Sequence, residues 1–257
     1  MVGCSGSFPS PDSPASCYLV EADDAQGRTW RVVLDLGSGA LGPLQRYTRL
    51  DTVDGLDAVV LSHLHPDHFS DVCGLYVFRR YAPGGPVRGT LPVYGPGGVA
   101  ARIGQAYGAD PADLATTLDI RELADAHPVT LGPLTITPHR VEHPVEAYGV
   151  RVEARAGPRT EVLAYTGDTD ACEALLPLAK GADLLLAEAS FQEGREDARG
   201  VHLTGLRAGR AAAEAGCRRL LLTHVPVWTE PDVVLAEARS AFPGPVELAR
   251  PGAVHVI

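Results

Sequence analysis

The sequence holds one dense cluster of residue types that bind metals, namely His63, His65, Asp67 and His68. The chain has nine histidines in 257 residues, and three of the nine fall within these six positions. Imidazole and carboxylate ligands suit divalent ions such as Zn, Mn or Fe. A polar loop that is histidine-rich by chance is the alternative, and we expect a metal site because such density rarely occurs without one.

The segment around this cluster indicates how its side chains are presented. The apolar run 58–61 predicts a buried strand that leads directly into the cluster. His63 and His65 are two residues apart, so in an extended segment they face the same side. Pro66 then turns the chain, which allows Asp67 and His68 to reach a second position. One loop could therefore supply two ions.

Three later residues also follow predicted strands and could complete the site. His143 lies in a turn between two strands, Asp168 follows a strand and a glycine, and His224 ends an apolar strand. Each has an ordinary alternative role, as a surface turn residue, a turn carboxylate or a cap on the sheet edge. Together with the first cluster, they are expected to be ligands.

Composition limits the class of protein. The length and the lack of a low-complexity linker predict one domain, spanning residues 1–257. The chain has 22 basic and 32 acidic residues, a net charge of −10, which argues against a broad nucleic-acid-binding face. A small anionic substrate remains compatible, because bound divalent ions would reverse the local field.

The cysteines and apolar segments predict a cytoplasmic protein. Five cysteines are scattered and form no CxxC motif, which is typical of free thiols in a reducing compartment. The first residues do not resemble a signal peptide, and no apolar run approaches membrane-spanning length. We therefore expect no membrane association.

The order of predicted elements indicates the fold class. Strands are expected at 17–21, 29–36, 57–62, 91–94, 129–131, 134–137, 147–154, 161–165, 183–187 and 220–223, with one or two more within 246–257. Helices are expected at 41–50, 71–81, 95–107, 172–180, 204–217 and 231–242, with a short piece from 110. The second half of the chain repeats the order of the first. This predicts an α+β fold, a four-layer αββα sandwich of two mixed β-sheets with helices outside.

The pattern His-x-His-x-Asp-His, followed by a later His, a Gly-Asp and a final strand-end His, resembles the metallo-β-lactamase superfamily. The segments 142–149 (EHPVEAYG) and 165–169 (YTGDT) are similar to its phosphodiesterase branch, which contains ribonuclease Z. The segments 11–16 (PDSPAS), 78–81 (FRRY) and 223–229 (THVPVWT) resemble an actinobacterial group of cyclic-AMP phosphodiesterases. The resemblance extends from residue 3 to about residue 242.

The resemblance implies a dinuclear site. It assigns His63, His65 and His143 to one ion, and Asp67, His68 and His224 to the other. Asp168 would bridge the two ions, which are expected to be Zn, with Mn or Fe as alternatives. A water molecule shared by two ions about 3.5–4 Å apart is deprotonated near neutral pH and could attack phosphorus.

Two departures from ribonuclease Z bear on the substrate. In that family a long Gly/Pro-rich arm that grips tRNA separates the counterparts of His143 and Asp168, whereas only 24 residues lie between them here. Ribonuclease Z also carries a His-Glu-Ala-Thr motif where this chain has Ala187-Glu188-Ala189-Ser190. Both changes, with the acidic net charge, favour a small phosphodiester over tRNA.

Three further residues are candidates for the site. His202 matches a position where relatives carry a histidine, and is expected to bind the phosphate and protonate the leaving oxygen; a helix-start histidine bonded to backbone is the alternative. Glu188 could orient His202 or simply be a buried, hydrogen-bonded carboxylate. We count His202, Glu188 and the ligand Asp67 as catalytic. Trp228 could stack on a nucleobase, but a packing role is favoured.

The ligand pattern and the resemblance together imply a dinuclear metal-dependent phosphodiesterase that opens 3′,5′-cyclic nucleotides to 5′-monophosphates, with cyclic AMP favoured by the resemblance alone. The resemblance leaves two enzymatic alternatives, RNA 3′-processing of the ribonuclease Z type and lactonase or β-lactamase chemistry. A metal-stabilised binding protein without turnover is a third. The expected partner is a small phosphodiester, without nucleic acid, and relatives suggest a homodimer.

Overall fold

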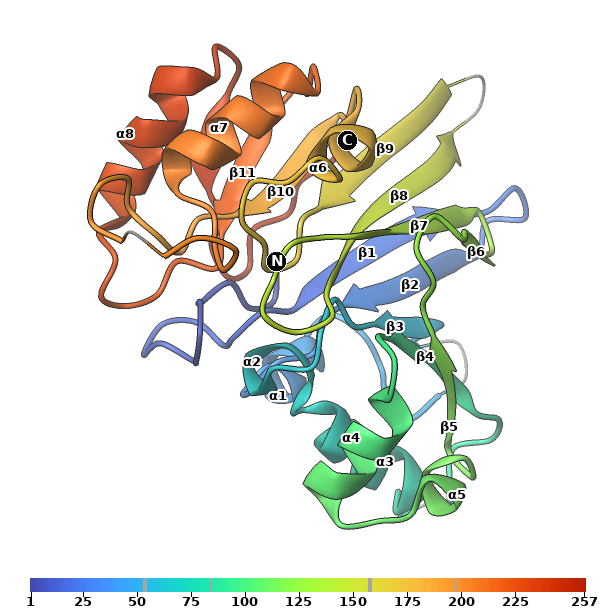
Figure 1. The fold of residues 1–257 in the computed structure, drawn as a ribbon. Coiled ribbons are helices and arrows are strands. Elements are labelled where there is room, and N and C mark those ends of the chain that lie inside the picture. The colour runs from blue at the N-terminus through green and yellow to red at the C-terminus, as the bar shows by residue number, and fades with distance from the viewer. Residues whose placement is uncertain (53–54, 84, 157–158, 197) are drawn as a thin grey trace.

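The computed structural model of the chain describes residues 1–52, 55–83, 85–156, 159–196 and 198–257. Two β-sheets lie face to face, and helices cover the outer face of each (Figure 1). In this view α1 to α5 lie below the sheets and α6 to α8 above them. The four-layer αββα sandwich predicted from the sequence is confirmed.

The first sheet has five strands in the order β1-β2-β3-β4-β5. The β1–β2 pair is antiparallel, and the following pairs are parallel. Its strands are β1 (Tyr18–Asp23), β2 (Thr29–Leu34), β3 (Ala58–Val60), β4 (Leu91–Gly95) and β5 (Leu118–Glu122). The sequence analysis missed β5, because three of its five residues are charged and it lies at the edge of the sheet, where one side of a strand needs no apolar cover.

The second sheet has seven strands in the order β12-β11-β10-β9-β8-β7-β6. Strands β6 to β9 form an antiparallel meander, and β9 to β12 are parallel. They are β6 (Val129–Leu131), β7 (Leu134–Arg140), β8 (Tyr148–Ala156), β9 (Arg159–Tyr165), β10 (Leu184–Glu188), β11 (Leu220–Thr223) and β12 (Val246–Leu248).

Several helices are shorter than the sequence predicts, among them α1 and α6. The helices are α1 (Leu41–Leu44), α2 (Pro66–Phe69), α3 (Val72–Arg80), α4 (Val99–Tyr107), α5 (Pro111–Leu114), α6 (Leu175–Ala179), α7 (Gly205–Glu214) and α8 (Pro231–Ala241). Both α1 and α6 contain a proline, which has no amide hydrogen to donate, and their flanks form tight i→i−3 turns such as Arg46 N to Pro43 O. No helix in the described ranges is long and apolar enough to cross a membrane.

The apolar core has three layers that match the order of the elements. Val32 and Leu34 of the first sheet pack against Ile136, Val150 and other residues of the second, between the sheets. Separate clusters fill the space under α1, α3 and α4 and the space under α6, α7 and α8. Burial of this apolar surface is the main term that holds the two sheets together.

Helix α7 follows the candidate His202 and is held tightly against α8. Thr204 caps it, because its Oγ1 accepts from the amide of Arg207 at 3.2 Å. Gly209 faces α8 so closely that a Cβ added there would lie 2.5 Å from the carbonyl oxygen of Ala238. The position of the segment that carries His202 therefore depends on this helix contact.

We expect Gly209→Ala to destabilise the protein by about 1–3 kcal/mol, because the methyl group would force the two helix backbones apart. Gly42→Ala in α1 is the matched control, since a Cβ at Gly42 meets nothing within 4 Å. Urea unfolding followed by circular dichroism measures both variants. Equal stability of the two variants would contradict the close contact.

Candidate metal centre

The turn after β3 presents the first four candidate ligands. The chain leaves β3 in an extended conformation, and His65 (φ −76°, ψ 147°) is the last residue before α2. Pro66 occupies the first turn of this helix, where its missing amide costs nothing. Asp67 and His68 lie on α2 and therefore leave the turn in another direction than His63 and His65. The predicted division of this turn into two pairs agrees with the structure.

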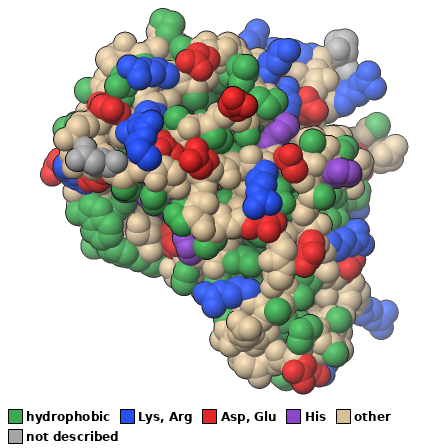
Figure 2. Space-filling view, in the orientation of Figure 1, with side chains coloured by type: hydrophobic (Ala, Val, Ile, Leu, Met, Phe, Trp, Pro, Cys, Tyr) green, Lys and Arg blue, Asp and Glu red, His purple; other side chains and the backbone are tan. Residues whose placement is uncertain are grey.

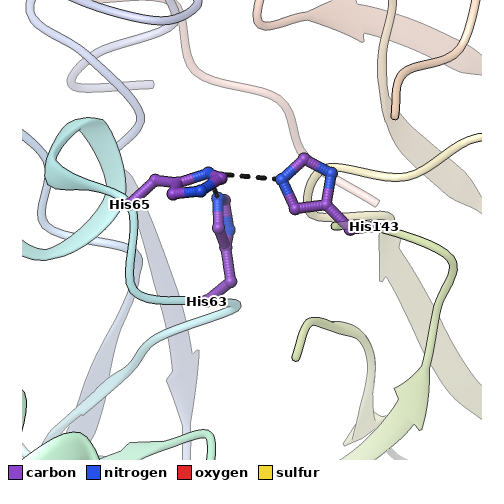
Figure 3. Close-up of side chains that lie close together, drawn as sticks. All are labelled: His63, His65 and His143. Carbon is purple, nitrogen blue, oxygen red and sulfur yellow. Dashed lines mark hydrogen bonds between the residues drawn. The ribbon is translucent and has the colours of Figure 1, made fainter. Parts of the chain in front are cut away.

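The first group of ligand atoms comprises one nitrogen each from His63, His65 and His143. Nδ1 of His65 lies 3.0 Å from Nε2 of His63 and 3.2 Å from Nε2 of His143. Figure 3 shows the three rings turned toward one another. His143 enters from the turn between β7 and β8, on the other sheet. Burial lowers the pKa of all three imidazoles, which favours the neutral form that binds metals.

The second group comprises Asp67, His68, Asp168 and His224, all of them buried. Nε2 of His224 lies 3.0 Å from Oδ2 of Asp67 and 3.2 Å from Nε2 of His68. Burial would raise the pKa of the Asp67 carboxyl, but His224 and His68 outweigh it and lower that pKa. Asp67 is therefore ionised and able to act as a ligand.

Asp168 lies between the two groups. Its Oδ2 is 3.7 Å from Nε2 of His63 in the first group and 3.3 Å from Nε2 of His224 in the second. Burial opposes ionisation of this carboxyl, but the surrounding histidines, His224 first, hold its pKa well below the usual range. A carboxylate that bridges two metal ions must lie between their two groups of ligands, and Asp168 does so.

The donor set fits divalent metal ions. Oδ1 of Asp168 is buried and accepts no hydrogen bond from the described residues, although a buried carboxylate oxygen without a partner is costly. Atoms that each lie 2.0–2.1 Å from one tetrahedral ion are about 3.3 Å apart. The nitrogens and oxygens of both groups are spaced at about this distance.

Four of the five clustered histidines are fixed in one tautomer by a partner on Nδ1. Nδ1 of His68 donates to Asp35 at 2.7 Å, and Nδ1 of His143 donates to the carbonyl of Val201 at 2.9 Å. The hydroxyls beside His63 and His224 donate elsewhere, so they accept from these rings. They belong to Ser62, 3.1 Å from His63, and to Ser190, 2.7 Å from His224. Each Nε2 is therefore left free for a metal ion.

Asp35 is the functional residue that the sequence analysis missed. Its carboxylate is fully buried and accepts from His68, from the amide and hydroxyl of Ser62, and from the hydroxyl of Tyr165 at 2.6 Å. Asp35 has φ +56°, a conformation that most side chains avoid. The sequence did show a carboxylate directly after the apolar strand β2, but the surrounding residues indicate only a turn.

Glu188 and His202 form a hydrogen-bonded pair beside the second group. Oε1 of Glu188 accepts from Nδ1 of His202 at 2.8 Å and from the amide of Thr169 at 2.9 Å. Burial would lower the pKa of His202, but the charge and the hydrogen bond of Glu188 raise it to about 9. His202 is thus protonated at neutral pH, and the prediction that Glu188 orients it agrees with this geometry.

Trp228 packs against Phe8, with ring centroids 5.0 Å apart, but this contact lies at the surface and not in the core. Its side chain is 55% exposed, because the loop after β11 carries it to the surface. The sequence offered no means to distinguish the two roles, since a single tryptophan after a ligand has no periodic partners.

Comparisons with known proteins agree with this site. The profile of the β-lactamase superfamily domain matches residues 30–225. An uncharacterized protein of Mycobacterium leprae is 46% identical over 96% of this chain and 84% of its own length. The probable metallo-hydrolase YhfI of Bacillus subtilis is 34% identical over 99% of this chain and 97% of its own.

The crystal structure of YhfI superposes with a TM-score of 0.83, covering 98% of this chain and 96% of that one at 32% identity. The ribonuclease Z of Myxococcus xanthus is 28% identical over 86% of each chain. The fold and the His/Asp cluster define a metallo-hydrolase that binds divalent metal. The chain belongs to the β-lactamase superfamily, with relatives of the YhfI and ribonuclease Z types.

Removal of the Asp35 charge tests the role of this buried carboxylate. We expect Asp35→Asn to weaken metal binding by about 10–100-fold, because His68 loses the acceptor that orients its ring. Metal content after dialysis against a graded chelator measures the effect. Asp183→Asn is the matched control, a buried carboxylate at the start of β10 that bonds the amide of Val162. A larger loss of metal in the control would contradict the assignment.

Proposed function

We propose that this protein is a two-metal phosphodiesterase that hydrolyses small phosphodiesters, with 3′,5′-cyclic nucleotides, cyclic AMP first, as substrates. The observation that carries the proposal is the position of His202, held by Glu188 at 2.8 Å beside two groups of candidate metal ligands with Asp168 between them. The carboxylates of Asp67 and Asp168 can hold metal ions and His202 can act as an acid, an arrangement that suits displacement at phosphorus.

Zinc ions bound by the two groups would supply a hydroxide nucleophile at neutral pH and neutralise charge on the phosphoryl oxygens. The chain itself supplies the proton. Because Nδ1 of His202 is engaged by Glu188, Nε2 is the nitrogen that donates to the leaving oxygen. Addition of water across the P–O3′ bond of a cyclic nucleotide then gives the 5′-monophosphate, with the proton from His202 on the 3′ oxygen.

Two features support a small substrate. Strands β8 and β9 take up most of the 24 residues between His143 and Asp168, which leaves no length for a tRNA-gripping arm. Acidic and basic side chains alternate over the face shown in Figure 2, and the net charge is −10. Tight binding to nucleic acid normally needs a continuous basic surface instead.

A ribonuclease Z-like activity is the second candidate, and the similarity to the Myxococcus ribonuclease Z supports it. The ligand groups and the protonated histidine would serve RNA 3′-processing equally well, since the bond that breaks is again P–O. The two candidates differ only in how the substrate is held outside the metal centre.

A substrate panel distinguishes the candidates. We expect zinc-loaded protein to hydrolyse cyclic AMP and cyclic GMP at least about 100-fold faster than it cleaves precursor tRNA, because nothing in the chain replaces the tRNA-gripping arm. Nucleoside monophosphates are separated by chromatography and RNA by gel electrophoresis. Metal-stripped protein is the control. Cleavage of tRNA with inert cyclic nucleotides would favour the second candidate, and an inert panel would overturn both.

The Glu188–His202 pair predicts the pH dependence of turnover. Activity that needs protonated His202 falls as the pH rises through a pKa of about 9. In Glu188→Gln the charge that raises the pKa of His202 is lost, while the burial that lowers it persists. We therefore expect the fall in activity (the basic limb of the profile) at about pH 6.5 or lower. His202→Ala should lower kcat by about 10²–10⁴-fold and abolish the limb, with the metal content unchanged.

Profiles of kcat against pH measure these changes, with Glu153→Gln on β8 as the control for loss of one carboxylate. An unshifted limb in Glu188→Gln would show that His202 is not the acid.

A further inference from the structure

Two exposed aromatic side chains, Phe8 and Trp228, form a pair at the surface. Their ring centroids are 5.0 Å apart at an angle of 52°, a geometry that is typical of favourable ring contacts. Phe8 is 39% exposed and Trp228 55%. Exposed aromatic surface of this kind is unfavourable in water and is typical of a binding site.

The aromatic pair adjoins the metal ligands. The amide of Ser7 lies 3.3 Å from Nε2 of His224, so Phe8 is the next residue after a group that touches the second ligand cluster. Trp228 follows His224 by four residues on the loop after β11. Gly6 joins the two segments, because its amide donates to the carbonyl of Val225 at 3.4 Å.

The backbone around the aromatic pair is well fixed. Arg195 donates to the carbonyl of Trp228 at 3.1 Å and to Oγ1 of Thr229 at 3.2 Å. Thr229 in turn donates to the carbonyl of Ser190, the residue that orients His224. On the first segment, Gly6 approaches the carbonyl of His224 so closely that a Cβ would lie 2.3 Å from that oxygen. The rings are therefore held before any ligand arrives.

The surface view agrees with this placement. Figure 2 shows hydrophobic side chains gathered where the N-terminal segment and the loop after β11 meet in Figure 1, with a histidine close by. The other exposed aromatics of the described residues include Tyr47 and Tyr81, and no ring contact joins either of them to this pair in the described part of the chain.

We propose that the aromatic pair is the part of the substrate site that receives a nucleobase. The inference rests on the proposed phosphodiesterase function and adds the side chains that bind the base of a nucleotide substrate, Phe8 and Trp228. In a nucleoside phosphodiester the base is one sugar away from phosphorus. Phe8 likewise lies close to the ligand cluster, because it directly follows Ser7, whose amide touches His224. Every base has a π-face, so stacking selects for a base without selecting which one.

Steady-state kinetics on two diesters test the proposal. We expect Phe8→Ala and Trp228→Ala each to raise KM for cyclic AMP about tenfold, with kcat changed less than about threefold, because stacking acts before the chemical step. The base-free 3′,5′-cyclic phosphate of ribose should show the same KM with wild type and both variants. Trp228→Phe should retain most of the affinity, and Tyr81→Ala, an exposed aromatic on another surface, should change nothing.

Trp228 also reports binding directly, without turnover. Adenosine, which has no phosphate, should quench the tryptophan fluorescence of the wild type but not that of Trp228→Phe, in which only Trp30 remains. Sedimentation at the same concentrations shows whether a second copy of the chain covers the pair instead. Dissociation of a dimer by Trp228→Ala without a change in KM would overturn the inference.

The two proposals fail in different ways. Hydrolysis of both diesters with unchanged KM in the variants would refute the role of the aromatic pair and leave the phosphodiesterase intact. Hydrolysis of neither diester would refute the phosphodiesterase, and quenching by adenosine would then still decide whether the pair receives a nucleobase.

Discussion

The fully buried carboxylate of Asp35 holds the cluster of ligand side chains in place. Asp35 accepts from Ser62 after β3, from His68 on α2 and from Tyr165 at the end of β9, so one side chain joins the two sheets. A buried charge persists only when its oxygens are fully bonded. The orientation of His68 and the approach of the sheets at this edge therefore depend on the same group.

The two halves of the site differ in the charges that surround their histidines. His63, His65 and His143 have lowered pKa values because burial dominates there. Burial also opposes the charge on His68, but Asp168 and Asp35 outweigh it and raise that pKa well above the usual value. The acidic residues are thus concentrated on the side of the cluster where His202 also lies, and this asymmetry favours an acid there.

The sequence predicted the layers of the fold and the convergence of the ligands. Strands β3 and β11 are short apolar runs with a histidine shortly after each, and the carboxyl ends of parallel strands meet at one edge of each sheet. The sequence did not predict the edge strand β5, whose apolar signal is weak, or the role of Asp35, which depends on contacts with residues far along the chain. Trp228 is exposed because a hydrogen bond from Arg195 helps fix the position of its loop. No local sequence pattern reveals this contact.

The ligands of each group come from both sheets, and this has a consequence for the stability of the whole chain. His63 and His65 belong to the first half of the sequence and His143 to the second sheet, while His68 and His224 are 156 residues apart. Neither half contains a complete ligand group, so the free energy of metal binding would add to the free energy of unfolding of both halves at once. Bound metal would therefore stabilise the contact between the two sheets, and its removal would lower the stability of both halves together.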